Sequence, residues 1–510
     1  MLKLNLIANF IGQGWTAFMG LAFIPVYVKY LGVESYGLIG LFALLQAWLR
    51  LLDMGLTPTI SREMAGYTGG SHTAGSIRDL LRSIEGVVLG VSFFVAGGVA
   101  LSADWIASSW VQAEEIPVIV VAQSITIMGL VSALRFVESV YRSSIVGLQR
   151  QVRLNVINSS MATLRGLGAV VVLVWVSPTI QAFFIWQALI SAVTLIIFAR
   201  TTYASLQCAE RSARFSVAAL SAVWRFAGGV LGITFLALLL TQVDKILLSK
   251  LLTLSDFGFY ALAAVVAGAL NMTIAPISQA WYPRLCQLHV AGDDEGLVRT
   301  FHQGAQLVTV IMGSTALVLI VFSETFLKLW TQDADLALRT APILRLLVLG
   351  NLLNGLMWIP YQTQLAHGWT GLTVRMNIIS VLLLVPAILW IVPRHGAEGA
   401  AWVWVCLNVG YVLIGVQFMY RRILISEKWR WYIQDLLQPL LVVTAVPVLV
   451  YWLVPVSEGF FEQLGTLVFA ASLTLVAAVV SAKLVRQKVC SVTASFVESY
   501  ALKKIHLKSL

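Results

Sequence analysis

The sequence has little charge and few residues of the kinds that carry enzyme chemistry. Only 11% of its 510 residues are Asp, Glu, Lys or Arg, whereas 59% are hydrophobic and the mean hydropathy is +0.86. Soluble domains contain roughly 25% charged residues. This shortage of charge excludes a soluble globular protein and indicates a chain that is largely embedded in a membrane.

Cysteine, histidine and catalytic motifs are equally sparse. The four cysteines are scattered without the paired spacing of a disulfide framework or a CxxC metal site: Cys208, Cys286, Cys406 and Cys490. There is no Walker motif, no nucleophile elbow, no HExxH and no cluster of metal ligands. All six histidines fall in predicted loops, at span ends or in the tail, so a buried imidazole relay is not expected. We therefore expect no enzyme activity, no metal and no cofactor.

Long apolar segments are abundant. A hydrocarbon core of about 30 Å is crossed by roughly 17 to 25 apolar residues in a helix. About fourteen such spans are predicted, at residues 7–28, 36–56, 84–103, 116–140, 156–176, 180–199, 222–248, 257–281, 303–327, 341–361, 374–392, 399–419, 436–454 and 464–482. The first lacks a small-residue cleavage site, so we expect it to be retained. The pattern predicts an all-α polytopic membrane protein.

Basic residues gather in alternate loops and in the tail. The loops contain Arg62, Arg78, Arg82, Arg142, Arg150, Arg153, Arg200, Arg211, Arg214, Arg284, Arg299, Arg421, Arg422, Lys428 and Arg430. The positive-inside rule places these loops and both termini in the cytoplasm. Nucleic-acid binding is disfavoured because the charges lie in short loops rather than on one patch. Residues 485–510 are basic with interspersed apolar residues, which predicts an amphipathic helix on the inner leaflet.

Residues 29–41 are echoed by residues 250–262 at a constant offset of 221 residues. Lys29 corresponds to Lys250, Leu31 to Leu252, Tyr36 to Phe257, Gly37 to Gly258 and Leu41 to Leu262. Both stretches predict a helix, a tight polar turn and a second helix. The offset covers six spans, so duplication predicts two parallel six-helix lobes related by a pseudo-two-fold axis along the membrane normal. The predicted parts are lobes at 1–205 and 216–425, an extra helix pair at 430–484 and the tail at 485–510.

Several ionisable residues fall inside predicted spans, where each costs about 2.5 to 3.5 kcal/mol and needs a cavity or a partner. Arg165 lies near the middle of its span, which contains no acid. Arg135 and Glu138 are three residues apart on one helical face, so they could form a purely structural pair. Asp244 and Lys245 are adjacent and therefore project from different faces of their helix. These five residues are candidates to line a polar cavity.

The sign of the deep charge indicates the cargo. The candidate substrate-binding cations are Arg165, Lys245, Arg135 and Arg50. Arg50, with Asp53 three residues on, lies near the inner rim, where a snorkelling structural role is favoured. The first span has no carboxylate. A cavity of this sign suits an anion, whereas an exporter of organic cations would need an unpaired acid. Asp244 and Glu138 are the candidate ion-coupling carboxylates.

The repeat carries a family resemblance. An apolar helix that runs into Gln242-x-Asp244-Lys245 and then Leu-Leu-x-x-x-Asp256-x-Gly258-x-Tyr260, echoed after the first span, resembles the polysaccharide transporter family. O-antigen flippases belong to this family, within the superfamily of multidrug/oligosaccharidyl-lipid/polysaccharide exporters. The resemblance covers the whole chain in architecture.

The resemblance implies an alternating-access flippase that moves an undecaprenyl-diphosphate-linked oligosaccharide from the inner to the outer face of a bacterial plasma membrane. Membrane lipids and a polysaccharide polymerase are candidate partners. The two last spans resemble the extra pair of fourteen-helix members such as lipid II flippases, where they flank a groove for the lipid tail. The alternative is a proton- or sodium-coupled multidrug exporter of the same superfamily. A scaffold or a glycosyltransferase is disfavoured because no catalytic domain is present.

Overall fold

The computed structural model describes residues 2–52, 56–68, 72–207, 213–216, 238–239, 242–369, 371–454, 459–488 and 490–491. They fall into two compact units, Met1–Ala261 and Leu262–Leu510. Nearly all of these residues are helical, and their only strand-like pairing is one isolated bridge between Gln112 and Thr253. The predicted all-α class is confirmed.

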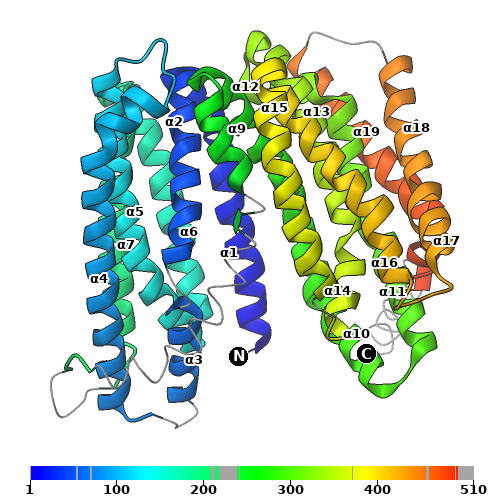
Figure 1. Ribbon diagram of the computed structural model, residues 1–510, viewed down its shortest axis with the longest axis horizontal. Coiled ribbons are helices and arrows are strands. Elements are labelled where there is room, and N and C mark those ends of the chain that lie inside the picture. The colour runs from blue at the N-terminus through cyan, green and yellow to red at the C-terminus, as the bar shows by residue number, and fades with distance from the viewer. Residues whose placement is uncertain are drawn as a thin grey trace, which may run out of the picture. The chain divides into compact units, whose positions relative to one another are not determined.

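The first unit consists of long helices joined by short connections (Figure 1). Its helices are α1 (Leu2–Ala22), α2 (Ile24–Leu52), α3 (Leu56–Thr68), α4 (Ala74–Trp105), the π-helix η1 (Ile106–Trp110), α5 (Val118–Gly147), α6 (Gln151–Val171), the π-helix η2 (Val172–Val176) and α7 (Ile180–Tyr203). Residues 242–250 are also helical, and α9 (Leu254–Ala269) runs across the boundary into the second unit.

The second unit has the same character. Its helices are η3 (Leu270–Thr273), α10 (Ile274–Ala291), α11 (Asp294–Val321), α12 (Ser323–Thr331), α13 (Ala334–Leu356), α14 (Trp358–Ala366), α15 (Gly371–Gly410), η4 (Tyr411–Gly415), α16 (Val416–Tyr420), α17 (Lys428–Arg430), η5 (Trp431–Leu437), α18 (Gln438–Leu453) and α19 (Phe460–Ser481).

Eleven helical segments of the described chain are long and apolar enough to cross a membrane. One of them, Gly371–Tyr420, covers two predicted spans and is broken at Gly396, whose backbone has φ 57° and ψ −146°. Such a positive φ costs glycine least because it has no Cβ. The helix α1 occupies the first predicted span, while most of the predicted span 222–248 lies outside the described residues. These findings establish a multi-pass membrane protein.

In the first unit, α5 is the central helix and packs against α3, α4 and α7, while α1 packs against α6. Apolar side chains between α3, α4, α5 and α7 form an apolar cluster, which includes Ile60, Met64, Ile84 and Phe198. Large apolar side chains such as that of Leu101 remain exposed. Apolar side chains suit a hydrocarbon environment. The backbone polar groups of such segments are satisfied within the helices, as lipid requires.

The two repeated stretches meet inside the first unit. A Cβ atom at Gly37 would overlap the carbonyl oxygen of Leu254, and one at Gly258 would overlap the carbonyl oxygen of Val33. The offset of 221 residues maps Val33 onto Leu254 and Gly37 onto Gly258, so the two contacts are reciprocal. Reciprocal contacts are the signature of a two-fold relation. The duplication predicted from the sequence is therefore visible as a local pseudo-two-fold contact of backbones.

In the second unit, α11 packs against α10, α13 and the extra helix pair α18 and α19, which also pack against each other (Figure 1). Two apolar clusters join the pair to α11, one around Val310 and Ala478, the other around Val318 and Ala470. Both alanines on α19 are fully buried. Small residues at such positions let helices approach closely enough to gain van der Waals contact in lipid.

The contact boundary between the units lies after residue 261. It assigns residues 242–261 to the first unit, although the sequence predicts that the second lobe begins at residue 216. Residues 217–237 lie outside the described part of the chain. The predicted ranges 1–205, 216–425 and 430–484 therefore stay predictions, as does the amphipathic tail, because 492–510 are likewise outside it.

Candidate functional site

Arg135, on α5, is the centre of a polar network in the first unit. Its Nη1 donates to Gln46 Oε1 at 2.8 Å, its Nη2 to Gln187 Oε1 at 3.1 Å and its Nε to Ser191 Oγ at 3.4 Å. The guanidinium also lies 5.1 Å from the ring centroid of Phe42. These partners come from α2 and α7 and are all neutral. They accept from three of the five N–H donors of Arg135 and leave its positive charge uncompensated by hydrogen-bonded acids.

Arg165, on α6, has fewer partners. Its Nε is buried with no hydrogen-bond partner, and Oε2 of the buried Glu138 is in the same condition. The indole of Trp186 donates to the backbone oxygen of Arg165 at 3.2 Å and so holds the helix rather than the side chain. A buried donor without an acceptor costs about 1 to 3 kcal/mol. A bound anion is a ligand that would satisfy such a donor.

Four charged residues of α5 and α6 are linked electrostatically through Glu138 and Arg165. They are Arg135, Glu138, Arg142 and Arg165, and we call them the arginine cluster. The cluster contains three guanidinium groups and one carboxylate, so its net charge is positive. Arg142 is its exposed member. The predicted candidates Arg165, Arg135 and Glu138 are thus brought together by the structure.

Asp244 and Lys245 form a loose ion pair in the helical segment 242–250. Lys245 Nζ lies 3.9 Å from Asp244 Oδ1, and the Tyr260 hydroxyl donates to Asp244 Oδ2 at 3.2 Å. Asp244 Oδ1 is buried and accepts no hydrogen bond. The long separation is consistent with adjacent side chains that project from different faces of one helix.

The remaining cation candidate, Arg50, lies in α2, and its side chain and Asp53 are outside the described part of the structure. Its role stays a prediction. Arg345, for which the sequence favours a structural role, donates from Nε to Ser323 Oγ at 2.6 Å.

An apolar cavity of about 300 Å³ opens between α2, α4, η1, α5 and the segment 242–250 in the first unit. Three tryptophans line it, Trp48, Trp105 and Trp110, and the indole of Trp110 donates to Ser249 Oγ at 3.2 Å. Ile246 and Ser249 place this cavity beside the helical segment that carries Asp244 and Lys245. Its lining suits a hydrocarbon group rather than a sugar.

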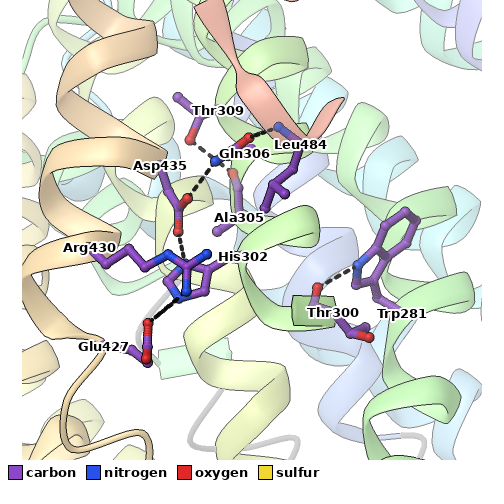
Figure 2. Close-up of polar contacts among 10 residues, drawn as sticks. All are labelled: Trp281, Thr300, His302, Ala305, Gln306, Thr309, Glu427, Arg430, Asp435 and Leu484. Carbon is purple, nitrogen blue, oxygen red and sulfur yellow. Dashed lines mark hydrogen bonds and ion pairs between the residues drawn. The ribbon is translucent and has the colours of Figure 1, made fainter. Parts of the chain in front are cut away.

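His302, Glu427 and Asp435 were not identified as a polar site from the sequence. The prediction that every histidine lies in a loop, at a span end or in the tail is wrong for His302, which is fully buried and contacts Glu427 and Asp435 (Figure 2). The helix α11 begins at Asp294 rather than near 303, which places His302 two turns inside it. The first turn of α11 is charged, so hydropathy alone does not indicate that the helix begins there. The N-cap Asp293, which accepts from Gly296 N, is the signal that could have found it.

The comparisons with known proteins agree with this architecture. The model of the family described as polysaccharide biosynthesis protein matches residues 2–289, which is more than half of the chain, and a MatE model matches residues 230–390. A candidate O-antigen transporter of Shigella flexneri is 21% identical over 423 residues, covering 82% of this chain and 97% of its own.

Two solved structures show the same fold. The lipid II flippase MurJ, in an inward closed conformation, superposes with a TM-score of 0.66 at 14% identity, covering 94% of this chain and 98% of its own. An inward-facing multidrug resistance MATE transporter of the MOP superfamily gives 0.61 at 13% identity, covering 81% and 96%. The fold is thus the two-lobe fold of multi-pass transporters rather than that of an enzyme. The chain belongs to the polysaccharide biosynthesis protein family.

Proposed function

We propose that the protein is a flippase that carries an undecaprenyl-diphosphate-linked oligosaccharide from the inner to the outer leaflet of a bacterial plasma membrane by alternating access. The observation that carries the proposal is the arginine cluster, with two half-buried guanidinium groups and one exposed guanidinium group near one carboxylate. The family and the O-antigen and lipid II relatives support the same cargo class.

The chemistry of the cargo fits the cluster. A diphosphate is anionic and offers several oxygens, and a guanidinium binds phosphate through paired, charge-assisted hydrogen bonds. Arg165 has a buried Nε without a partner and so has donor capacity for a ligand. Arg135 already uses three of its five N–H groups on Gln46, Gln187 and Ser191, so it has fewer donors for a ligand and contributes chiefly charge. Glu138 limits the net charge and keeps the anion releasable.

The membrane potential can drive the step. If two negative charges leave a cell whose interior is negative, export gains roughly 4.6 kcal/mol per 100 mV, twice the single-charge value. Glu138 and Asp244 are the carboxylates available for additional ion coupling.

We propose that both termini face the cytoplasm, as the basic loops indicate. We also propose that a polysaccharide polymerase receives the exported unit.

The direct test is binding and flipping of undecaprenyl-diphosphate sugar by purified protein in liposomes. We expect Arg165→Ala to weaken binding about ten- to a hundredfold, because a hydrogen bond to a charged group contributes about 1.5 to 3 kcal/mol. Arg165→Lys should retain part of the affinity as a point charge. Arg345→Ala is the matched control, since its guanidinium already bonds to Ser323. Equal binding by Arg165→Ala and the wild type would exclude this site.

The second candidate function is a cation-coupled multidrug exporter. The MatE match over residues 230–390 and the MATE structures favour it. It predicts efflux of cationic dyes that depends on Asp244. A deletion strain separates the two functions, because loss of a surface polysaccharide with accumulation of its lipid-linked unit supports the flippase. Altered drug sensitivity without such a defect supports the exporter.

A further inference from the structure

The histidine on α11 is held between two carboxylates of one short stretch, residues 427–435. The ring of His302 is fully buried, its Nε2 lies 2.9 Å from Glu427 Oε2, and its Nδ1 makes a short contact with Asp435 Oδ2 (Figure 2). Asp435 is also buried, whereas the Glu427 side chain is 19% exposed. The ring therefore connects a core helix of the second unit to the start of the extra helix pair.

The surrounding hydrogen bonds define the state of Asp435. Gln306 Nε2 donates to Asp435 Oδ1 at 2.8 Å, while Gln306 Oε1 accepts from the backbone nitrogen of Leu484 at 2.9 Å (Figure 2). The backbone N–H can only donate, so it fixes the orientation of the amide and makes Asp435 Oδ1 an acceptor. Asp435 Oδ2 is left to interact with the ring.

Counting protons shows what this geometry requires. A neutral imidazole has one N–H and one lone pair, so it can donate to only one of two carboxylates. The other contact would then set a lone pair against a carboxylate oxygen. Both contacts are attractive only when two protons lie in them. Imidazole, with an ordinary pKa of about 6.5, is a stronger base than either carboxylate at about 4. The second proton therefore belongs on the ring.

We propose that His302, Asp435 and Glu427 form a proton-binding site, and that the bound proton fastens segment 427–437 to α11. With the ring cationic, the ring and Arg430, which lies 3.3 Å from Glu427 Oε2, balance the two carboxylates. Loss of the proton makes one contact repulsive. Glu427 is the partner that leaves, because it is the one that water can reach.

The other charged groups around the site agree with this assignment. The charges of both carboxylates act on the hydroxyl of Tyr420, on α16, and keep it protonated and neutral. Burial by itself would raise the pKa of the Glu427 carboxyl, but its hydrogen bond to His302 and the charges of His302 and Arg430 lower the pKa below the ordinary value. Glu427 is therefore an ionised acceptor that leaves the proton to the ring.

A metal ion does not explain the arrangement. Zinc ligands converge on one centre about 2 Å from each donor atom. Here the two carboxylates approach opposite nitrogens of one ring, so no single ion could contact both of them and the ring. None of its residues belongs to the arginine cluster or lines the apolar cavity.

The test is ¹⁵N spectroscopy of histidine-labelled full-length protein, whose six histidines give few signals. His302→Gln identifies the signal by its disappearance. At about pH 7.5, where unperturbed imidazole is neutral, we expect both ring nitrogens of His302 to carry protons. One protonated and one unprotonated nitrogen would overturn the proposal, because the proton would then reside on a carboxylate or be absent.

A second variant keeps the test valid even if His302→Gln does not fold. Glu427→Gln removes the charge of the more exposed partner, so the doubly protonated signal should persist only to a lower pH. Amide hydrogen exchange in residues 428–437 should become about tenfold faster, as loss of one charged hydrogen bond implies. Glu462→Gln, an exposed glutamate of α19, is the matched control. If Glu427→Gln titrates and exchanges as the wild type does, the proton does not hold the segment.

Discussion

At the residue scale, the same side chain takes different roles according to its partners. Arg135 is satisfied by three neutral acceptors, whereas Arg165 keeps a buried donor without one. Both were candidates on the same argument, that a cation at membrane depth needs a cavity or a partner. Their contacts differ, and the unpartnered Nε is why we propose Arg165 as the residue that binds an anion directly.

Glu34 is a residue whose importance the sequence does not reveal. It is 5% exposed and accepts backbone hydrogen bonds from Glu114 at 2.7 Å, Glu115 at 2.9 Å and Ile116 at 3.5 Å. Its carboxylate thereby holds the connection between η1 and α5 to the turn of α2 at Gly32, where φ is 80°. A carboxylate supplies only acceptors, which is what three backbone N–H groups require.

We expect Glu34→Gln to destabilise the protein by about 1 to 3 kcal/mol, because the amide NH₂ would face backbone donors and leave some of them unsatisfied. Thermal unfolding in detergent, followed by intrinsic tryptophan fluorescence, measures the change. Glu114→Gln makes the same chemical change on an exposed side chain and should leave the midpoint unaltered. Equal midpoints for the two variants would show that the Glu34 contacts contribute little.

At the element scale, the contact between the repeated stretches rests on glycine. Gly37 and Gly258 each abut a backbone carbonyl of the other stretch, and a Cβ at Gly40 would meet that of Ala261, its counterpart at the same offset. Backbone groups cannot rotate away as a side chain can. The contact therefore tolerates no Cβ at Gly37 or Gly258 unless the stretches move apart.

Gly37→Val should separate the two stretches. Spin labels at Tyr30→Cys and Asp256→Cys, both exposed sites in the first unit, report their distance by pulsed electron resonance once the natural cysteines are replaced. We expect a longer and broader distribution in Gly37→Val. Gly20→Val is the control, since a Cβ there meets no atom within 4 Å. Gly258→Val should reproduce the effect of Gly37→Val, because the contacts are reciprocal. An unchanged distribution in both variants would contradict the contact.

At the scale of the whole molecule, charge determines how the membrane potential acts on transport of the proposed cargo. The chain has a formal charge of +10, concentrated in alternate loops, and its arginine cluster is positive. A cargo carrying two negative charges responds to the potential with roughly 4.6 kcal/mol per 100 mV. A cationic drug responds with the opposite sign, so the potential discriminates between the two candidate functions.

We expect flipping of a diphosphate-linked sugar to accelerate when a potassium diffusion potential makes the donor side negative. The measurement is the initial rate of lipid appearance in the opposite leaflet, with valinomycin setting the potential. Reversing the potassium gradient should slow the same reaction. A rate independent of the potential would mean that charge movement is compensated by a coupled ion, and Glu138→Gln and Asp244→Asn would then identify the carrier.

Much of the fold could be predicted from the sequence, because its determinants are local. Apolar length indicates the helices, loop charge predicts the orientation, and the offset of 221 residues reveals a duplication that the contacts of Gly37 and Gly258 display. The sign of the buried charge was available in the same way. The start of α11 could not be predicted from apolar length, because its charged first turn extends the helix beyond its apolar part.

The sequence by itself determined the class of the protein, its helical spans and the residue types at depth, because composition and periodicity are sufficient for these. Only the tertiary structure decided which charges meet. Glu34 and Glu114 are 80 residues apart, Arg135 and Gln46 are 89 apart, and His302 and Asp435 are 133 apart. Such pairings depend on helix packing, which lipid does not drive through hydrophobicity and which close contact and hydrogen bonds must specify.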